Sequence, residues 1–120
     1  MLDPTALDSL TKLIGGDRRL LGPLIESFLE VAPNLQAEVR AGTLAGDGKR
    51  LQTAAHTIKS SARDFGAVRL ADLCQELEKL GRDGGIARAR ELLSTFETEH
   101  ELALAALAGE LALLAVRKVG

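Results

Sequence analysis

Hydrophobic residues recur every three or four positions throughout this chain, in segments that end at glycine or proline. The breaks fall at Gly15-Gly16, Ala32-Pro33, Gly46-Asp47-Gly48, Gly66 and the stretch from Gly81 to Gly85. Spacings of three and four place apolar side chains on one face of an α-helix, whereas a half-buried strand alternates with a period of two. No segment alternates in that way. The pattern therefore predicts an all-α protein built from amphipathic helices.

The first half of the chain carries two signals for the start of a helix. Asp3 followed by Pro4, and later Asp17, would accept hydrogen bonds from the free N–H groups of a first helical turn. The first helix would turn inward Leu7, Leu10, Leu13 and Ile14 before it ends at Gly15. The second would bury Leu20, Leu21, Leu24, Ile25, Phe28 and Leu29. We expect this second helix to end near Pro33, or to bend there into a third segment bearing Leu35, Val39 and Leu44.

Three further helices are predicted, at residues 47–65, 67–80 and 86–118. The first would bury Leu51, Ala55, Ile58, Ala62 and Phe65, and the second Leu70, Leu73, Cys74, Leu77 and Leu80. The third carries one stripe of Ala89, Leu93, Phe96, His100, Leu104, Leu107, Leu111 and Leu114, as one long helix that projects or as two segments bent at Gly109. Short glycine-rich connections favour antiparallel neighbours. We therefore expect an antiparallel up-and-down four-helix bundle with a peripheral N-terminal helix and a long C-terminal helix.

Length and composition limit the other possibilities. The 120 residues fit a single domain, 1–120. A net charge of −2 and only 2% aromatic residues give neither the basic surface nor the stacking groups of a nucleic-acid-binding protein. No signal peptide or membrane span is encoded, and the lone Cys74 has no partner for an intramolecular disulfide. We expect a cytoplasmic monomer that binds no metal and does not act on membranes.

His56 is the residue on these helices with the clearest chemical potential. It follows Ala55 of the buried seam by one position and is therefore turned about 100° away from it, toward solvent. The same face also carries Lys59, Ser60 and Arg63 after the histidine and Lys49 and Gln52 before it. An accessible imidazole is nucleophilic near pH 7, and a neighbouring ammonium can hold the oxygens of a phosphoryl group. From spacing alone, an ordinary surface histidine remains the commoner explanation.

The residues around His56 resemble a known family. The run from Ala55 to Ala67 reads AHTIKSSARDFGA, and the next helix carries Leu70, Leu73, Cys74, Leu77, Glu78 and Gly81. This is similar to the histidine-containing phosphotransfer (HPt) domain of two-component phosphorelays, whose usual pattern is A-H-x-L-K-G-S-S-x-x-[LF]-G-A followed by L-x-x-L-C-x-x-L-E-x-x-G. The alignment needs no gap, and weaker similarity extends over roughly Leu2 to Phe96.

The resemblance implies an antiparallel four-helix bundle with an exposed histidine in the middle of one helix. It implies that His56 is the phosphoacceptor and that Lys59 neutralises the phosphoryl group. Glu78 would orient Lys59 or the imidazole, and Ser61 matches a family serine whose role is less certain. Gly66 would end the histidine helix.

Two positions depart from the family pattern. Ser60 stands where the family most often has a glycine that lets a partner come close, and Ala62 where a second serine is common. Serine is still small, so we expect it to tune docking. Lys49, Gln52 and Arg63 would belong to the same docking surface.

The implied function is that of a phosphocarrier, not of an ATP-dependent kinase. It would take a phosphoryl group from the aspartate of one response-regulator receiver domain, or of a hybrid histidine kinase receiver, and pass it to another. The chain would bind no cofactor, and Mg²⁺ would reside in the partner receiver. The alternative is a non-catalytic interaction module, either a degenerate HPt domain or a bundle that dimerises through its C-terminal helix. We expect the second histidine, His100, to be a packed structural residue and Cys74 to act as a small hydrophobe.

Overall fold

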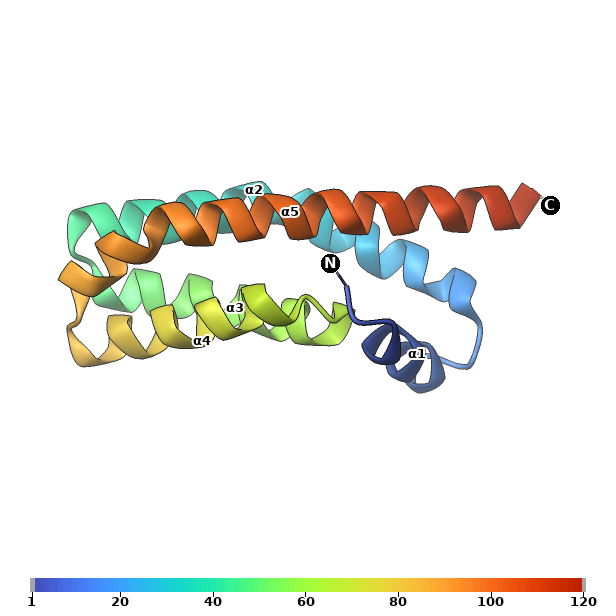
Figure 1. Ribbon diagram of the computed structural model, residues 1–120, viewed down its shortest axis with the longest axis horizontal. Coiled ribbons are helices and arrows are strands. Elements are labelled where there is room, and N and C mark those ends of the chain that lie inside the picture. Colours follow the sequence, from blue (N-terminus) through green and yellow to red (C-terminus); the bar gives the residue numbers. More distant parts are fainter. Residues whose placement is uncertain (1, 120) are drawn as a thin grey trace.

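The computed structural model describes residues 2–119, with side chains up to Val116, and these residues form helices joined by short turns, with no strand among them. The elements are α1 (Pro4–Leu13), the 3₁₀ turn η1 (Arg18–Leu20), α2 (Leu21–Ala45), α3 (Gly48–Phe65), α4 (Val68–Asp83) and α5 (Ile86–Val119). Figure 1 shows α2 and α5 side by side in one layer and α3 and α4 in the other. The shorter α1 packs against α3 at one end. None of the described helices is both long and apolar enough to cross a membrane.

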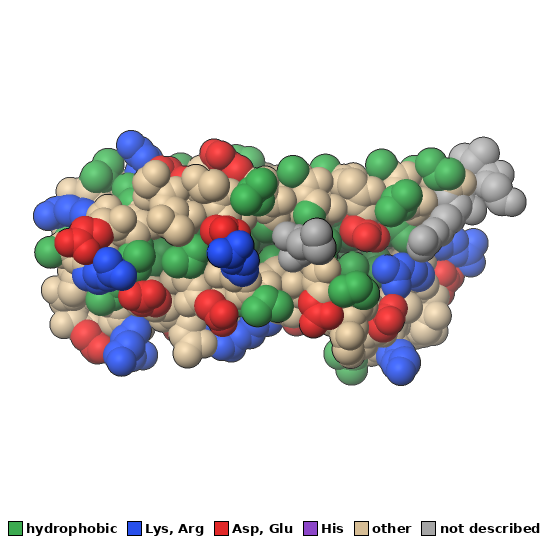
Figure 2. Space-filling view, viewed as in Figure 1, with side chains coloured by type: hydrophobic (Ala, Val, Ile, Leu, Met, Phe, Trp, Pro, Cys, Tyr) green, Lys and Arg blue, Asp and Glu red, His purple; other side chains and the backbone are tan. Residues whose placement is uncertain are grey.

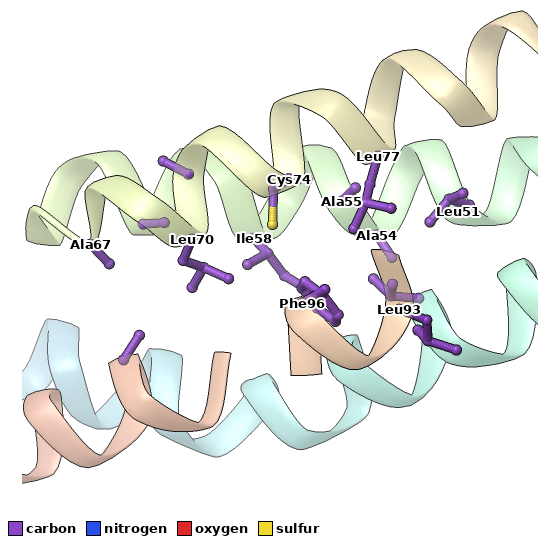
Figure 3. Close-up of a cluster of buried hydrophobic side chains, with 14 of the residues drawn as sticks. Leu51, Ala54, Ala55, Ile58, Ala67, Leu70, Cys74, Leu77, Leu93 and Phe96 are labelled. Atoms are coloured by element: carbon purple, nitrogen blue, oxygen red, sulfur yellow. The ribbon is translucent and has the colours of Figure 1, made fainter. Parts of the chain in front are cut away.

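Two groups of buried side chains hold the helices together. The first lies between α3, α4 and the facing halves of α2 and α5, and Figure 3 shows Leu51, Ile58, Cys74, Leu77 and Phe96 pointing into it. The second joins α1, the N-terminal half of α2 and the C-terminal half of α5 around Leu7, Ile25, Phe28, Leu107 and Leu114. The seam predicted for α3 is confirmed, because all five of its expected residues are buried.

Aspartate side chains begin the helices as expected. Asp3 accepts a hydrogen bond from the Thr5 N–H at 2.9 Å, and Asp47 accepts one from the Arg50 N–H at 3.1 Å. Asp17 caps η1, which then leads into α2. Each cap satisfies an N–H group that has no partner within the helix. Local chemistry therefore fixes the starts of α1, η1 and α3, whereas α2 and α4 begin without a side-chain cap.

The interpretation of Pro33 as the end of a helix is wrong. α2 continues through it to Ala45, so the segments expected before and after proline form one helix of 25 residues. Proline removes one backbone hydrogen bond and crowds the preceding turn, which disfavours a helix. Here Ala32 and Val39, on either side of Pro33, are fully buried, whereas Pro33 itself is exposed. The packing of both halves against the core offsets the local cost.

α5 is continuous, and Gly109 does not divide it. Its C-terminal half does not simply project, because Leu107 and Leu114 pack against α1 and α2 in the second buried group. The long α2 and α5 thus extend past the ends of α3 and α4 and share their own core.

Some predicted core residues lie at the surface. Leu13 is 84% exposed, and Leu20, Leu24 and Leu44 are also exposed. Of the residues expected inside α4, Leu73 and Leu80 are only half buried. Leu13 and Leu44 lie at the ends of α1 and α2 and Leu20 lies in η1, so helical spacing alone does not decide whether such residues are buried.

A close contact between two glycines positions α3 against α4. A methyl group added at Gly48 would lie 2.3 Å from the carbonyl oxygen of Gly81, and one added at Gly81 would lie 2.6 Å from the carbonyl oxygen of Gly48. No side chain fits at either position, so the two helix backbones touch there. This crossing sets the spacing of α3 and α4 on the face that carries His56.

Candidate functional site

His56 lies in the middle of α3 with its imidazole facing solvent. Its side chain is 59% exposed, while its neighbour Ala55 is fully buried. The exposure expected from the helical spacing is therefore confirmed. An incoming group can reach the ring without any movement of the core.

Glu78 of α4 holds both His56 and Lys59. Its Oε2 lies 2.8 Å from His56 Nδ1, and its Oε1 lies 2.5 Å from Lys59 Nζ. The side chains of Lys59 and Glu78 are each 14% exposed. One carboxylate on the neighbouring helix thus joins the imidazole and the ammonium into a single cluster, here called the His56–Lys59–Glu78 triad.

The charge of Glu78 decides which nitrogen of His56 carries the proton. The hydrogen bond from Lys59 lowers the pKa of the Glu78 carboxyl, partial burial opposes this, and the hydrogen bond with His56 lowers the pKa further. Glu78 is therefore ionised near neutral pH and can only accept hydrogen bonds. His56 must donate through Nδ1–H, so the lone pair of a neutral ring lies on Nε2.

A second contact between α3 and α4 lies one turn beyond the triad. Arg63 donates to Gln75 Oε1 at 2.6 Å. Gln75 lies three residues before Glu78 on α4, and Arg63 lies four residues after Lys59 on α3. The Arg63–Gln75 and Lys59–Glu78 contacts therefore lie one turn apart between the same faces of α3 and α4. Gln75 was not singled out from the sequence, although its spacing from Glu78 is a usable signal. Arg63 is held beside the triad by this bond.

Ser60 borders His56 without obstructing it. Its hydroxyl donates to the backbone carbonyl of His56 at 3.2 Å, and the residue is exposed. Because the hydroxyl is turned back to its own helix, the surface above it stays small. This is compatible with serine in place of the family's glycine.

In the part of the chain that the structure describes, the other residues predicted for the site make no hydrogen bond or ion pair with the triad. Exposed Lys49 lines a shallow depression between α2 and α3 that includes Glu38, and the backbone of Gln52 packs on Gly81. The structure does not place Ser61 beside Glu78. Ser61 lies on the opposite flank of α3, in a depression shared with side chains of α1 and α2. Ser61 lies two residues after Lys59 on α3, and this spacing turns its side chain away from the helix face that carries Lys59.

His100 and Cys74 are structural, as expected. His100 is fully buried, stacks on Phe96 with ring centroids 5.4 Å apart and contacts Gln36 Oε1 through Nδ1 at 2.5 Å. Burial lowers the pKa of His100 to about 4, so its ring is neutral near pH 7. Burial raises the pKa of the Cys74 thiol to about 12, which leaves it unreactive. Gln36 as the partner of His100 was not predicted.

Within the described side chains, no group of three His, Cys, Asp or Glu residues is arranged to hold a metal ion. The acidic residues near His100 instead pair with other side chains. Glu97 bonds Arg40 at 2.7 Å, and Glu101 accepts from Gln36 at 3.3 Å. These two contacts join α5 to α2.

Comparisons with known proteins agree with this geometry. A family model, the Hpt domain, matches residues 23–115. The structure is similar to the crystal structure of histidine-containing phosphotransfer protein B (HptB) from Pseudomonas aeruginosa PAO1, with a TM-score of 0.79 and 29% sequence identity. The similarity covers 92% of this chain and 94% of that chain. A search of curated proteins returns no significant match. This chain therefore belongs to the Hpt domain family of histidine phosphotransfer proteins.

Proposed function

We propose that this protein carries a phosphoryl group on Nε2 of His56 between the aspartates of receiver domains. The lone pair of Nε2 attacks the phosphorus of an aspartyl phosphate, the P–O bond to the aspartate breaks, and the aspartate leaves as a carboxylate. The reverse reaction passes the group to a second receiver. The observation that carries the proposal is the contact of Glu78 with Nδ1 of an exposed ring, because it leaves Nε2 free for attack.

Glu78 supports the chemistry through charge. When Nε2 forms its bond to phosphorus, the ring that still carries the Nδ1 proton becomes positively charged. The carboxylate 2.8 Å from Nδ1 stabilises that charge as it develops and holds the ring in one orientation. It remains ionised throughout and takes up no proton.

Lys59 provides a cation beside the transferred group. Its ammonium has three N–H donors, of which one is directed at Glu78. The remaining donors are available to oxygens of a phosphoryl group on His56, one turn away on the same helix face. Because the Lys59 side chain is largely buried, its charge is screened less than that of an exposed lysine.

The partners that fit this chemistry are response-regulator receivers and the receiver of a hybrid histidine kinase. We propose that the receiver brings the Mg²⁺ for transfer and that this chain brings the nucleophile, the cation and a docking surface around Ser60 and Arg63. Nothing in the proposal requires ATP, and one chain suffices for each transfer. A reduced, buried Cys74 suits the cytoplasm as the place of the exchange.

The proposed architecture is an antiparallel up-and-down four-helix bundle of α2 to α5 in a single domain, residues 1–120. The short connections at Gly46-Asp47, Gly66-Ala67 and Gly84-Gly85 support it, since such links join neighbouring helices. The buried group that joins α1 with α2 and α5 supports the inclusion of the N-terminal helix.

Transfer from labelled receivers tests the proposal. Purified receivers carrying a radioactive aspartyl phosphate should pass label to the parent protein and to His100→Gln, but not to His56→Gln. The adduct should be labile in acid and stable in alkali, as a phosphorus–nitrogen bond requires. Binding of a receiver without any transfer of label would instead identify a degenerate, non-catalytic interaction module.

A further inference from the structure

The outer face of the C-terminal half of α5 is apolar and uncovered. Between Leu102 and Val116 the sequence contains one charged residue, Glu110. Leu102 is 55% exposed, Leu113 50% and Val116 69%. Soluble monomers rarely leave a continuous apolar surface of this kind exposed.

The exposed residues follow a regular spacing along the helix. Leu102, Ala105, Gly109, Ala112 and Val116 are separated by three or four positions, and all are exposed. The opposite side of the same segment is buried in the second core group. A helix that is apolar on both sides is normally covered on both. The outer side therefore lacks a partner.

We propose that this face, here called the α5 outer face, pairs with the same face of a second copy in antiparallel orientation. A twofold axis at Gly109 would place Leu102 opposite Val116 and Ala105 opposite Leu113. Leu113 then meets the small Ala105, Leu102 and Val116 lie at the two ends of the contact, and the backbones approach most closely at the glycine, where an added Cβ finds no atom within 4 Å. This size pattern is complementary to itself.

Charge favours the antiparallel orientation. The segment begins after acidic Glu97, Glu99 and Glu101 and ends at Arg117 and Lys118 in the sequence. In an antiparallel pair, the acidic stretch that precedes the segment in one copy and the basic stretch that follows it in the other copy belong to the same end of the contact. A parallel pair would bring like charges together.

The expected dimer is weak and leaves His56 accessible. Pairing two stretches of this length would bury roughly 1,000 Å² in total, which is at the low end for a specific interface, so we expect a reversible association. α3 contacts α2 and α4, whereas α5 lies on the far side of them. Figure 2 shows hydrophobic side chains along α5 toward its C-terminal end and no histidine on that face. This proposal departs from the monomer expected from the sequence.

Sedimentation velocity from about 1 µM to about 1 mM tests the association. The parent should shift from monomer to dimer as concentration rises, and Ala105→Lys should weaken the dimer at least about tenfold because it places a charge in the apolar contact. Ala87→Lys is the matched control, since Ala87 is also exposed on α5 but lies outside the apolar segment. It should dimerise like the parent. A monomer at every concentration, including one that binds lipid vesicles, overturns the proposal, as does a dimer that Ala105→Lys leaves intact.

Single cysteines test the orientation. Gly109→Cys should form a disulfide-linked dimer under mild oxidation, because the two copies of residue 109 meet at the axis. Leu102→Cys should not, since its counterpart in the partner would lie about 21 Å away along the helix. Native Cys74 is fully buried and does not interfere. Cross-linking through residue 102, with or without residue 109, would refute the antiparallel register. Phosphotransfer should proceed in all these variants, so the result is independent of the function proposed for His56.

Discussion

Removal of the Glu78 carboxylate should slow phosphotransfer while leaving the fold intact. In Glu78→Ala the imidazole loses its 2.8 Å contact and Lys59 its 2.5 Å contact. The ring is then free to rotate, and its developing positive charge has no anion beside it. A hydrogen bond to a charged group contributes about 1.5–3 kcal/mol, and the 59% exposure of His56 places this one at the lower end. A loss of about 1.4 kcal/mol in the transition state corresponds to a tenfold slower reaction.

Single-turnover transfer from a phosphorylated receiver measures this effect. Glu78→Ala should react about tenfold more slowly than the parent, and Glu78→Gln should fall between them because its amide oxygen still accepts from Nδ1–H without supplying charge. Gln75→Ala is the matched control on the same helix. It removes the contact that holds Arg63 at the docking surface but leaves the triad, so at saturating receiver it should react within about twofold of the parent. A Glu78→Ala protein that binds the receiver and transfers at the parental rate would refute the role given to Glu78.

Three further predictions concern packing, titration and docking. Gly81→Ala should destabilise the protein by about 1–3 kcal/mol in chemical denaturation, because its Cβ would lie 2.6 Å from a backbone oxygen, whereas Gly109→Ala should stabilise it by up to about 1 kcal/mol. Folding lowers the pKa of His100 from 6.5 to about 4, so between these pH values the unfolded chain binds a proton that the folded chain does not. The free energy of unfolding should therefore drop by roughly 3 kcal/mol as the pH falls from 6.5 to about 4. His100→Gln should abolish that drop in pH-dependent unfolding; an unchanged profile would assign it to another group. Ser60→Gln should melt like the parent but accept phosphate at least about tenfold more slowly, since its longer side chain crowds the approach to His56. A parental rate would show that receivers do not approach over this face.

The sequence predicted those features that depend on local chemistry. The α3 seam from Leu51 to Phe65 keeps a regular spacing, and aspartate and glycine mark the ends of several helices, so these elements were located correctly. The exposure of His56 followed from its place one position beyond Ala55. The position of Glu78 near the site came from the family resemblance, because no spacing rule relates residues on two different helices.

Features that depend on tertiary contacts were missed. Whether α2 breaks at Pro33 is decided by what its two halves pack against, and the core contacts of Ala32 and Val39 keep it continuous. Leu13 lies on the expected stripe but is the last residue of α1, and it is exposed. Ser61 was grouped with the site by family pattern, although its angle around α3 turns it toward α1 and α2.

The identity of the phosphorylated nitrogen tests the account most directly. The protein can be labelled with ¹⁵N in histidine, phosphorylated by a receiver and studied by ¹⁵N and ³¹P NMR under alkaline conditions that preserve the adduct. Because Glu78 holds Nδ1–H, we predict a single phosphohistidine at residue 56 with phosphorus bonded to Nε2. Phosphorus on Nδ1 of His56, or on any other residue, would contradict the proposed role of the triad.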